Sequence, residues 1–170
     1  FTMLPVTILG IDPGTATTGF GVIEMNSSGL ALVTYGLIKT AKEGSPENRL
    51  ASIFDEMNLL FTRYNPHVMA IEKVFFSNNA KTAIRVGQAQ GVMLLAAAHR
   101  RVPVAEYAPG TIKKQVTGSG RADKKMVMKT VIEILGTKVS VALTGKTHFD
   151  NAADALAIAM CHAFKERDKS

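Results

Sequence analysis

The spacing of the apolar residues changes once along this chain, near residue 45, and the change limits the folds that the chain can adopt. Before that point, three short segments are rich in β-forming residues, at 6–11, 18–25 and 30–38. Turn residues separate them at 12–14 and 26–29. Three strands joined by short turns predict an antiparallel meander.

Beyond residue 45, segments with helical spacing alternate with short apolar runs. Ser45 followed by Pro46 is typical of a helix start. We expect two more strands, at 67–72 and 102–107, and helices at 46–64, 79–101, 111–116, 124–135 and 149–164. This order predicts an α/β fold with a mixed five-stranded sheet, flanked by helices.

The length of 170 residues predicts one domain, because a domain contains about 150 residues. We expect it to span residues 3–165. Phe1 and Thr2 precede Met3, where we expect translation to begin. The charged segment 166–170 is typical of a frayed tail.

The composition excludes several classes of protein. A single cysteine, Cys161, excludes a disulfide framework and favours a reducing, cytoplasmic compartment. No apolar run approaches the ~20 residues that span a bilayer, and no signal peptide is recognised, so no membrane association is expected. Lys and Arg number 20 against 14 Asp and Glu, and the resulting net charge of +6 favours a polyanionic partner such as nucleic acid.

Carboxylates end two of the predicted strands. Asp12 and Glu72 each terminate an apolar run. A carboxylate in that position is costly unless it is solvated, hydrogen-bonded or bound to a cation. Asp12 alone would also fit an ordinary turn. Because the two strands can be neighbours, we expect both acids at one edge of the sheet.

The last helix adds Asp150, Asn151 and Asp154, spaced so that Asp154 shares a helix face with either of the others. Asp150 also fits the preference for acids in a first helical turn, whereas Asp154 lies a full turn inside a small-residue segment.

Oxygen ligands from two strands and a helix predict a site for Mg²⁺ or Mn²⁺. Two such ions about 4 Å apart can activate a water and stabilise the leaving oxygen of a phosphodiester. We therefore expect a metal-dependent nuclease.

Five segments of the chain resemble bacterial RuvC, the family of Holliday-junction resolvases. They are GIDPGTATTGFGVIE, IEKVFF, GQAQGV, EYAPGTIKKQVTGSGRADK and DNAADALAIA, in family order between Ile8 and about His162. The resemblance implies an RNase H-like fold, a homodimer, and Mg²⁺-dependent paired nicking of four-way junctions in recombination and repair. It also implies a bacterial cytoplasmic location and cooperation with the RuvA–RuvB motor. Of its four acidic positions, three match: Asp12, Glu72 and Asp154.

The fourth acidic position of the family falls three residues before the last Asp, where this chain has Asn151. Two interpretations remain open. Asn151 either inactivates the site and leaves a junction-binding protein, or it is a natural ligand. In the second case, adjacent Asp150 or a water completes the shell of the metal.

Basic residues surround the glycine-bearing loop at 117–121 and are predicted to bind DNA. They are Lys113, Lys114, Arg121, Lys124 and Lys125. Backbone N–H groups of such a loop can approach phosphates, and lysines add sequence-independent affinity. A solvated helix face would explain any single one of these residues. By resemblance, Lys113 and Lys124 match positions near the scissile strand.

Phe75 and Arg85 are two further predicted DNA contacts. Phe75 follows the strand that ends at Glu72. Burial is the simpler explanation of an aromatic residue, but the family match favours stacking on an unpaired base, worth ~1–3 kcal/mol. Arg85 is expected to contact the DNA backbone.

The predicted helix at 79–101 carries a small and apolar face that is our candidate dimer surface, with core packing as the alternative. Its members are Ile84, Gln88, Gly91, Leu95 and Ala98.

A competing function is suggested by the segment GIDPGTATTG, which also resembles the first phosphate loop of actin-like ATPases and sugar kinases. Those proteins need two such domains, and no second glycine phosphate loop is found in the sequence.

Overall fold

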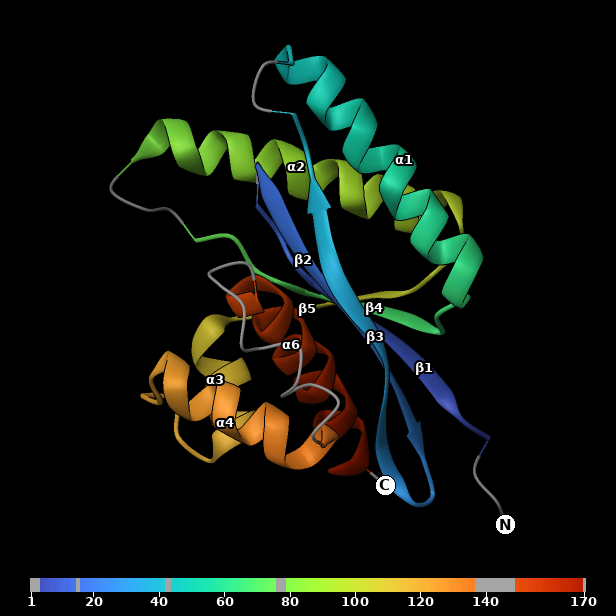
Figure 1. The fold of residues 1–170 in the computed structure, drawn as a ribbon, viewed down its shortest axis with the longest axis vertical. Helices are drawn as coiled ribbons and strands as arrows, with labels where there is room; N and C mark the ends of the chain where they lie inside the picture. The colour runs from blue at the N-terminus through green and yellow to red at the C-terminus, as the bar shows by residue number, and fades with distance from the viewer. Residues whose placement is uncertain (1–3, 15, 42–43, 76–78, 137–148, 170) are drawn as a thin grey trace.

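The structure is a computed structural model that describes residues 4–14, 16–41, 44–75, 79–136 and 149–169 (Figure 1). The strands in these residues are β1 (Val6–Asp12), β2 (Thr17–Asn26), β3 (Gly29–Lys39), β4 (Val68–Glu72) and β5 (Val104–Tyr107). The helices are α1 (Pro46–Tyr64), α2 (Ala80–His99), α3 (Pro109–Thr117), α4 (Lys124–Leu135) and α6 (Phe149–Arg167). The predicted order of elements is confirmed.

The strands form one sheet in the order β3-β2-β1-β4-β5. Strands β1, β2 and β3 pair antiparallel, which confirms the predicted meander. Strand β4 is parallel to both β1 and β5. Because Ile11 of β1 is paired with Ile71 of β4, the next residues, Asp12 and Glu72, lie at the same edge of the sheet, as expected.

Helices cover both faces of the sheet (Figure 1). Successive residues of β1 point to opposite faces. Ile8 packs in a core with α3, α4 and α6. Leu9 and Ile11 pack in a second core with α1 and α2. The central strands are therefore apolar on both sides, which explains their nearly continuous apolar runs.

The ends of α1 agree with the sequence prediction because local signals set them. The Ser45 hydroxyl accepts a hydrogen bond from the N–H of Asn48, and Pro46 occupies the first turn. Asn65 ends the helix in a left-handed conformation, with φ of 43°. Among the described helices, none is both long and apolar enough to span a membrane.

The frayed tail expected at 166–170 stays a prediction, and its described residues have the following contacts. Helix α6 continues to Arg167, and the N–H of Asp168 donates to the carbonyl of Phe164 at 3.0 Å. The Asp168 carboxylate accepts a hydrogen bond from Gln115 of α3 at 3.2 Å. This tertiary contact holds the charged end of α6, and the charge pattern alone did not indicate it. The predicted domain start at Met3 lies outside the described residues.

Candidate active site

Three carboxylates lie within electrostatic reach of one another near the edge of the sheet where β1 and β4 end. Asp12 and Glu72 end these two strands, and Asp154 lies on α6, which packs across β1 and β2. Burial, followed by the negative charges of Asp154 and Glu72, raises the pKa of Asp12 to about 7. Burial and the charge of Asp154 also raise the pKa of Glu72. The three predicted acids are thus close enough to repel one another.

Three glycines let the backbone of α6 pack directly on the sheet. A Cβ atom on Gly19 would lie 1.9 Å from the carbonyl oxygen of Asn151, and one on Gly10 would lie 2.0 Å from that of Ala155. A Cβ on Gly21 would overlap the side chain of Leu156, at 2.6 Å. Gly19 is also the β2 residue paired with Asp12. The close packing therefore brings the acidic end of α6 to the acidic end of β1.

These glycines were not among the site residues predicted from the sequence. Gly10 and Gly21 face each other across β1 and β2, and α6 is rich in alanine where it meets them. Small residues on both a sheet face and a helix face predict close backbone approach. These small residues could therefore have predicted from the sequence that α6 packs closely on the sheet.

Lys124 belongs to the carboxylate site. Its ammonium lies 3.1 Å from Oδ2 of Asp154. Burial alone would lower the pKa of Lys124, but the hydrogen bond and the charge of Asp154 outweigh it and the pKa is raised. Burial raises the pKa of Asp154 despite this ion pair. Lys124, predicted as a DNA contact, thus also neutralises part of the acidic cluster.

The first turn of α6 holds both candidates for the fourth acidic position. The charge of Asp150 raises the pKa of Asp154 and of Lys124, so it lies within electrostatic reach of that ion pair. Asn151 packs its backbone carbonyl against Gly19. Both residues lie at the end of α6 that is near the other acids, and which of them serves as the fourth ligand stays a prediction.

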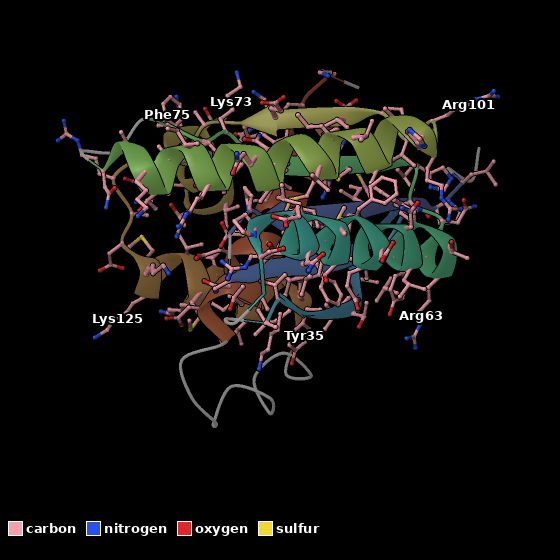
Figure 2. All side chains as sticks on the ribbon, turned by 90° about the horizontal axis from the view of Figure 1, so that it is seen from above. Tyr35, Arg63, Lys73, Phe75, Arg101 and Lys125 are labelled. Atoms are coloured by element: carbon pink, nitrogen blue, oxygen red, sulfur yellow. The ribbon has the colours of Figure 1, made fainter. Side chains whose placement is uncertain are left out.

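Other predicted DNA contacts surround the acids. Phe75 is 59% exposed, so core burial does not explain it. It lines a cavity of about 320 Å³ together with Glu72 and residues of α2. Phe75 and Lys125 lie toward one end of the molecule, opposite Arg63 and Arg101 (Figure 2).

The remaining basic residues differ in their distance from the acids. Lys113 lies near the acids, since its charge lowers the pKa of Glu72 against the larger effect of burial. Lys114 and Arg121 are exposed near the turn after α3. Arg85 is not in this group, because it lines a different cavity, between α1 and α2.

The model of one family, described as crossover junction endodeoxyribonuclease RuvC, matches residues 8–162. The chain belongs to the RuvC family. RuvC of Moorella thermoacetica is 45% identical over 166 residues, which cover 95% of this chain and 96% of the relative. RuvC of Rubrobacter xylanophilus is 46% identical over 160 residues, or 94% of this chain and 86% of the relative.

Solved structures of RuvC have the same fold. Thermus thermophilus RuvC is 32% identical and superposes with a TM-score of 0.83, covering 96% of this chain and 97% of that one. The same protein in complex with a Holliday junction substrate gives a TM-score of 0.85 at 32% identity, covering 96% of each chain. The yeast mitochondrial resolvase Ydc2, at 17% identity and a TM-score of 0.69, shows the fold alone. The predicted RNase H-like fold is confirmed.

Membership of the RuvC family implies a metal-dependent nuclease, so we asked whether the residues fit a metal. Among the described residues, no three His, Cys, Asp or Glu side chains are grouped closely enough to hold an ion. The expected cage is therefore not assembled by the side chains as they stand. The donor chemistry does fit a hard divalent cation, because Asp12, Glu72 and Asp154 supply only oxygen atoms and a cation would offset their repulsion.

A second contact that was not predicted from the sequence joins α6 to the sheet of this RuvC fold. The hydroxyl of Tyr107 and Nδ1 of His162 form a hydrogen bond of 2.6 Å. Tyr107 is the β5 residue paired with Glu72. His162 lies two turns beyond Asp154, so the bond helps to fix α6 relative to β5.

Proposed function

We propose that this chain nicks four-way DNA junctions in pairs, using Mg²⁺, with Mn²⁺ as a substitute and two ions in each site. The observation that carries the proposal is that Asp12, Glu72 and Asp154 lie within electrostatic reach of one another at one sheet edge, with Lys113 and Lys124 also within reach. An acidic centre within a basic protein suits a nuclease, because the acids bind metal and the surrounding cations bind phosphate.

Each residue of the site has a part in this proposal. Asp12, Glu72 and Asp154 would hold the metal, and Asn151 or Asp150 would add an oxygen ligand. The metal would activate the attacking water and stabilise the leaving oxygen. Lys124 and Lys113 orient the scissile phosphate, since both lie within electrostatic reach of the acids.

Residues around the acids would hold the rest of the junction. Exposed Phe75, directly after β4, stacks on a base unpaired at the crossover. The exposed side chains of Lys114, Arg121 and Lys125 contact backbone phosphates and supply affinity without sequence preference.

The decisive experiment compares a synthetic four-way junction with a linear duplex of the same sequence. We expect paired nicks in the junction with Mg²⁺ or Mn²⁺, and none with EDTA. Asp12→Asn should abolish nicking and leave junction binding within about threefold, because Asp12 is assigned to the metal. Junction binding without nicking by the unmodified chain would support the alternative that Asn151 inactivates the site.

The exposed face of α2 supports the proposed homodimer. Ile84 and Leu95 are 62% and 51% exposed, and Gln88, Gly91 and Ala98 are exposed beside them. The core face of α2 is formed by other residues, such as Met93, so core packing does not account for this face. A Cβ on Gly91 would meet no atom within 4 Å. A helical glycine costs about 1 kcal/mol relative to alanine, and a close dimer contact would explain it.

Leu95→Glu tests the dimer. It should give monomers in analytical ultracentrifugation, because it places a charge in the contact. Leu59→Glu is a matched control, since Leu59 is 61% exposed on α1 and outside this face. Equal sedimentation of the two variants would count against the α2 dimer.

Three further expectations stay predictions. We propose cooperation with the RuvA–RuvB motor, a location in the bacterial cytoplasm, and a single nuclease domain at residues 3–165. Co-purification of RuvA and RuvB with the tagged chain from its own cells would test the first.

A further inference from the structure

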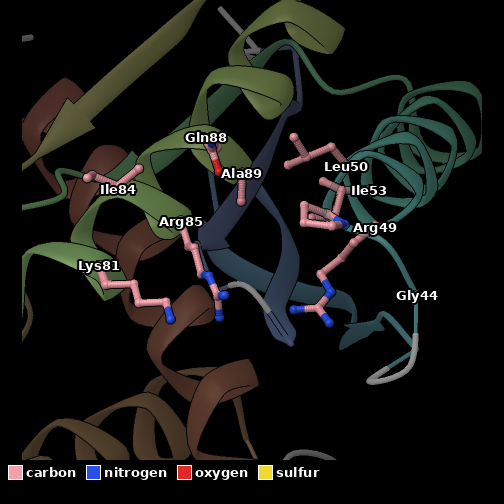
Figure 3. A pocket seen from close by; sticks show the side chains of 10 residues that line it. Gly44, Arg49, Leu50, Ile53, Lys81, Ile84, Arg85, Gln88 and Ala89 are labelled. Carbon is pink, nitrogen blue, oxygen red and sulfur yellow. The ribbon is translucent and has the colours of Figure 1, made fainter.

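A second cavity lies between the first halves of α1 and α2, and the proposed active site does not use it. Its volume is about 530 Å³, within the range of roughly 300–1,000 Å³ that is usual for ligand pockets. Arg49 lines it from α1, and Lys81 and Arg85 line it from α2. The charged ends of these three side chains extend to the same side of the two helices (Figure 3).

The charged side chains among the described lining residues of this cavity are all cations. Pro46 and Lys81 both line it, so the first turns of α1 and α2 face it. The N-terminus of a helix carries a partial positive charge and adds to the field of the side chains. In the described part of the chain, neither Lys81 nor Arg85 forms an ion pair. The cavity therefore suits an anion.

The lining also limits the kind of anion. None of the described lining residues is acidic, so this cavity offers no carboxylate to hold the metal of a nucleoside triphosphate. None of them is aromatic, so the cavity has no platform on which a base could stack. Its floor includes the aliphatic side chains of Leu50 and Ile53, whereas Ile84, which is 62% exposed, lies where the cavity borders the proposed dimer face of α2. Cations without a platform for a base or a carboxylate for a metal suit a sugar-phosphate backbone better than a free nucleotide.

The cavity lies across α2 from the groove of the active site. Thr82, Ala83 and Val86 face the Phe75 cavity, whereas Lys81, Ile84 and Arg85 face the cationic cavity. The first two turns of α2 therefore form a wall shared by both. A DNA strand that passes Glu72 and Phe75 has the cationic cavity on the far side of this wall.

We propose that Arg49, Lys81 and Arg85 form a second phosphate-binding site, which holds a DNA backbone segment of the junction across α2 from the scissile strand. This inference rests on the proposed function, because it takes junction DNA as the ligand. Arg85, expected as an isolated backbone contact, becomes one of three cations from two helices. The site contributes affinity and leaves the chemistry at Asp12 unchanged.

The test uses the full chain and removes two exposed charges at a time. Lys81→Gln/Arg85→Gln takes charge from the cavity. Arg63→Gln/Arg101→Gln takes the same charge from the opposite end of the molecule (Figure 2). We measure junction affinity over a range of salt concentrations in an Asp12→Asn background, to prevent cleavage. The cavity variant should bind about tenfold more weakly, and its slope of log K against log salt should fall by about 0.9 for each lost phosphate contact.

A second measurement tests whether the junction covers Lys81. Acetylation of lysines, followed by mass spectrometry, should show Lys81 protected by the junction, while Lys129 of α4 remains reactive. Arg49→Gln is made separately, because Arg49 also donates to the carbonyl of Ala41 at 3.3 Å. Protection of Lys81 by ATP or pyrophosphate, with none by the junction, would overturn the proposal in favour of a free anion site.

The two proposals fail in different ways. If the unmodified chain neither binds nor nicks the junction, the proposed function is wrong. If it does both, and the cavity variant has the affinity and salt slope of the Arg63/Arg101 control, the second phosphate site alone is wrong.

Discussion

The ammonium of Lys124 lies 3.1 Å from the carboxylate of Asp154, so the first residue of α4 is part of the acidic site on α6. Its neighbour Lys125 is exposed. Adjacent lysines on one helix therefore have different surroundings, and this difference can be measured.

We expect Lys124→Ala to lower the nicking rate by at least a hundredfold and to change junction affinity little. Asp154 already neutralises much of the charge of Lys124, so its loss releases few counterions from DNA. Lys125→Ala, the matched control, should reduce the salt slope by about 0.9 and leave the nicking rate at saturating junction unchanged. Single-turnover rates and salt titrations measure both effects. A Lys124→Ala variant that lost affinity and kept its rate would show that Lys124 is only a phosphate contact.

Asn151→Asp should raise the nicking rate at least tenfold and lower the Mg²⁺ concentration required. A carboxylate in place of the amide adds a negative charge beside the ion, and tenfold in rate corresponds to about 1.4 kcal/mol in the transition state. If Asp150 already serves as the fourth ligand, Asp150→Asn should be damaging and Asn151→Asp nearly neutral. Mg²⁺ titrations of the two variants distinguish these outcomes. No change in either would leave Asp154 as the only metal ligand from α6.

Gly19→Ala should destabilise the fold and reduce nicking. The new Cβ would lie 1.9 Å from the carbonyl oxygen of Asn151, so α6 must shift away from β2. Overpacking of this kind costs about 3 kcal/mol. Gly110→Ala is the control, because a Cβ there meets no atom within 4 Å. Urea unfolding measures both, and equal stability of the two variants would contradict the close packing of α6 on β2.

Asp12→Asn should stabilise the metal-free protein at pH 8 and have little effect at pH 4. Burial and neighbouring acids raise the pKa of Asp12 to about 7 in the folded state, whereas the unfolded value is about 3.9. The folded state therefore holds this proton more tightly, and stability is lost progressively as the pH rises from about 4, the pKa in the unfolded chain, to about 7, the pKa in the folded state. Asparagine resembles the neutral acid and avoids the loss, which is at most about 4 kcal/mol at pH 8, because each unit of pKa shift corresponds to about 1.4 kcal/mol.

Unfolding in EDTA at several pH values measures this effect. Asp55→Asn is the matched control, because Asp55 is an exposed residue in the interior of α1, far from the acidic site in the sequence. If Asp12→Asn raised the free energy of unfolding by the same amount at pH 4 and at pH 8, Asp12 would not be a buried carboxyl repelled by its neighbours.

The sequence by itself determined the order of the elements and the acidic ends of two strands. These features depend on local chemistry. The period of the apolar residues distinguishes strand from helix, and Ser45, Pro46 and Asn65 set the ends of α1 within a few residues. The motifs at Asp12, Glu72 and Asp154 were also sufficient for the family.

Tertiary structure alone decided what each of these residues touches. The ion pair of Lys124 with Asp154 joins residues 30 positions apart in the chain, and the approach of α6 to Gly19 depends on how two faces pack. The cavity of Arg49, Lys81 and Arg85 exists only because α1 and α2 begin side by side. Hydropathy and propensity describe each segment separately, whereas these contacts depend on the distances between segments that packing brings together.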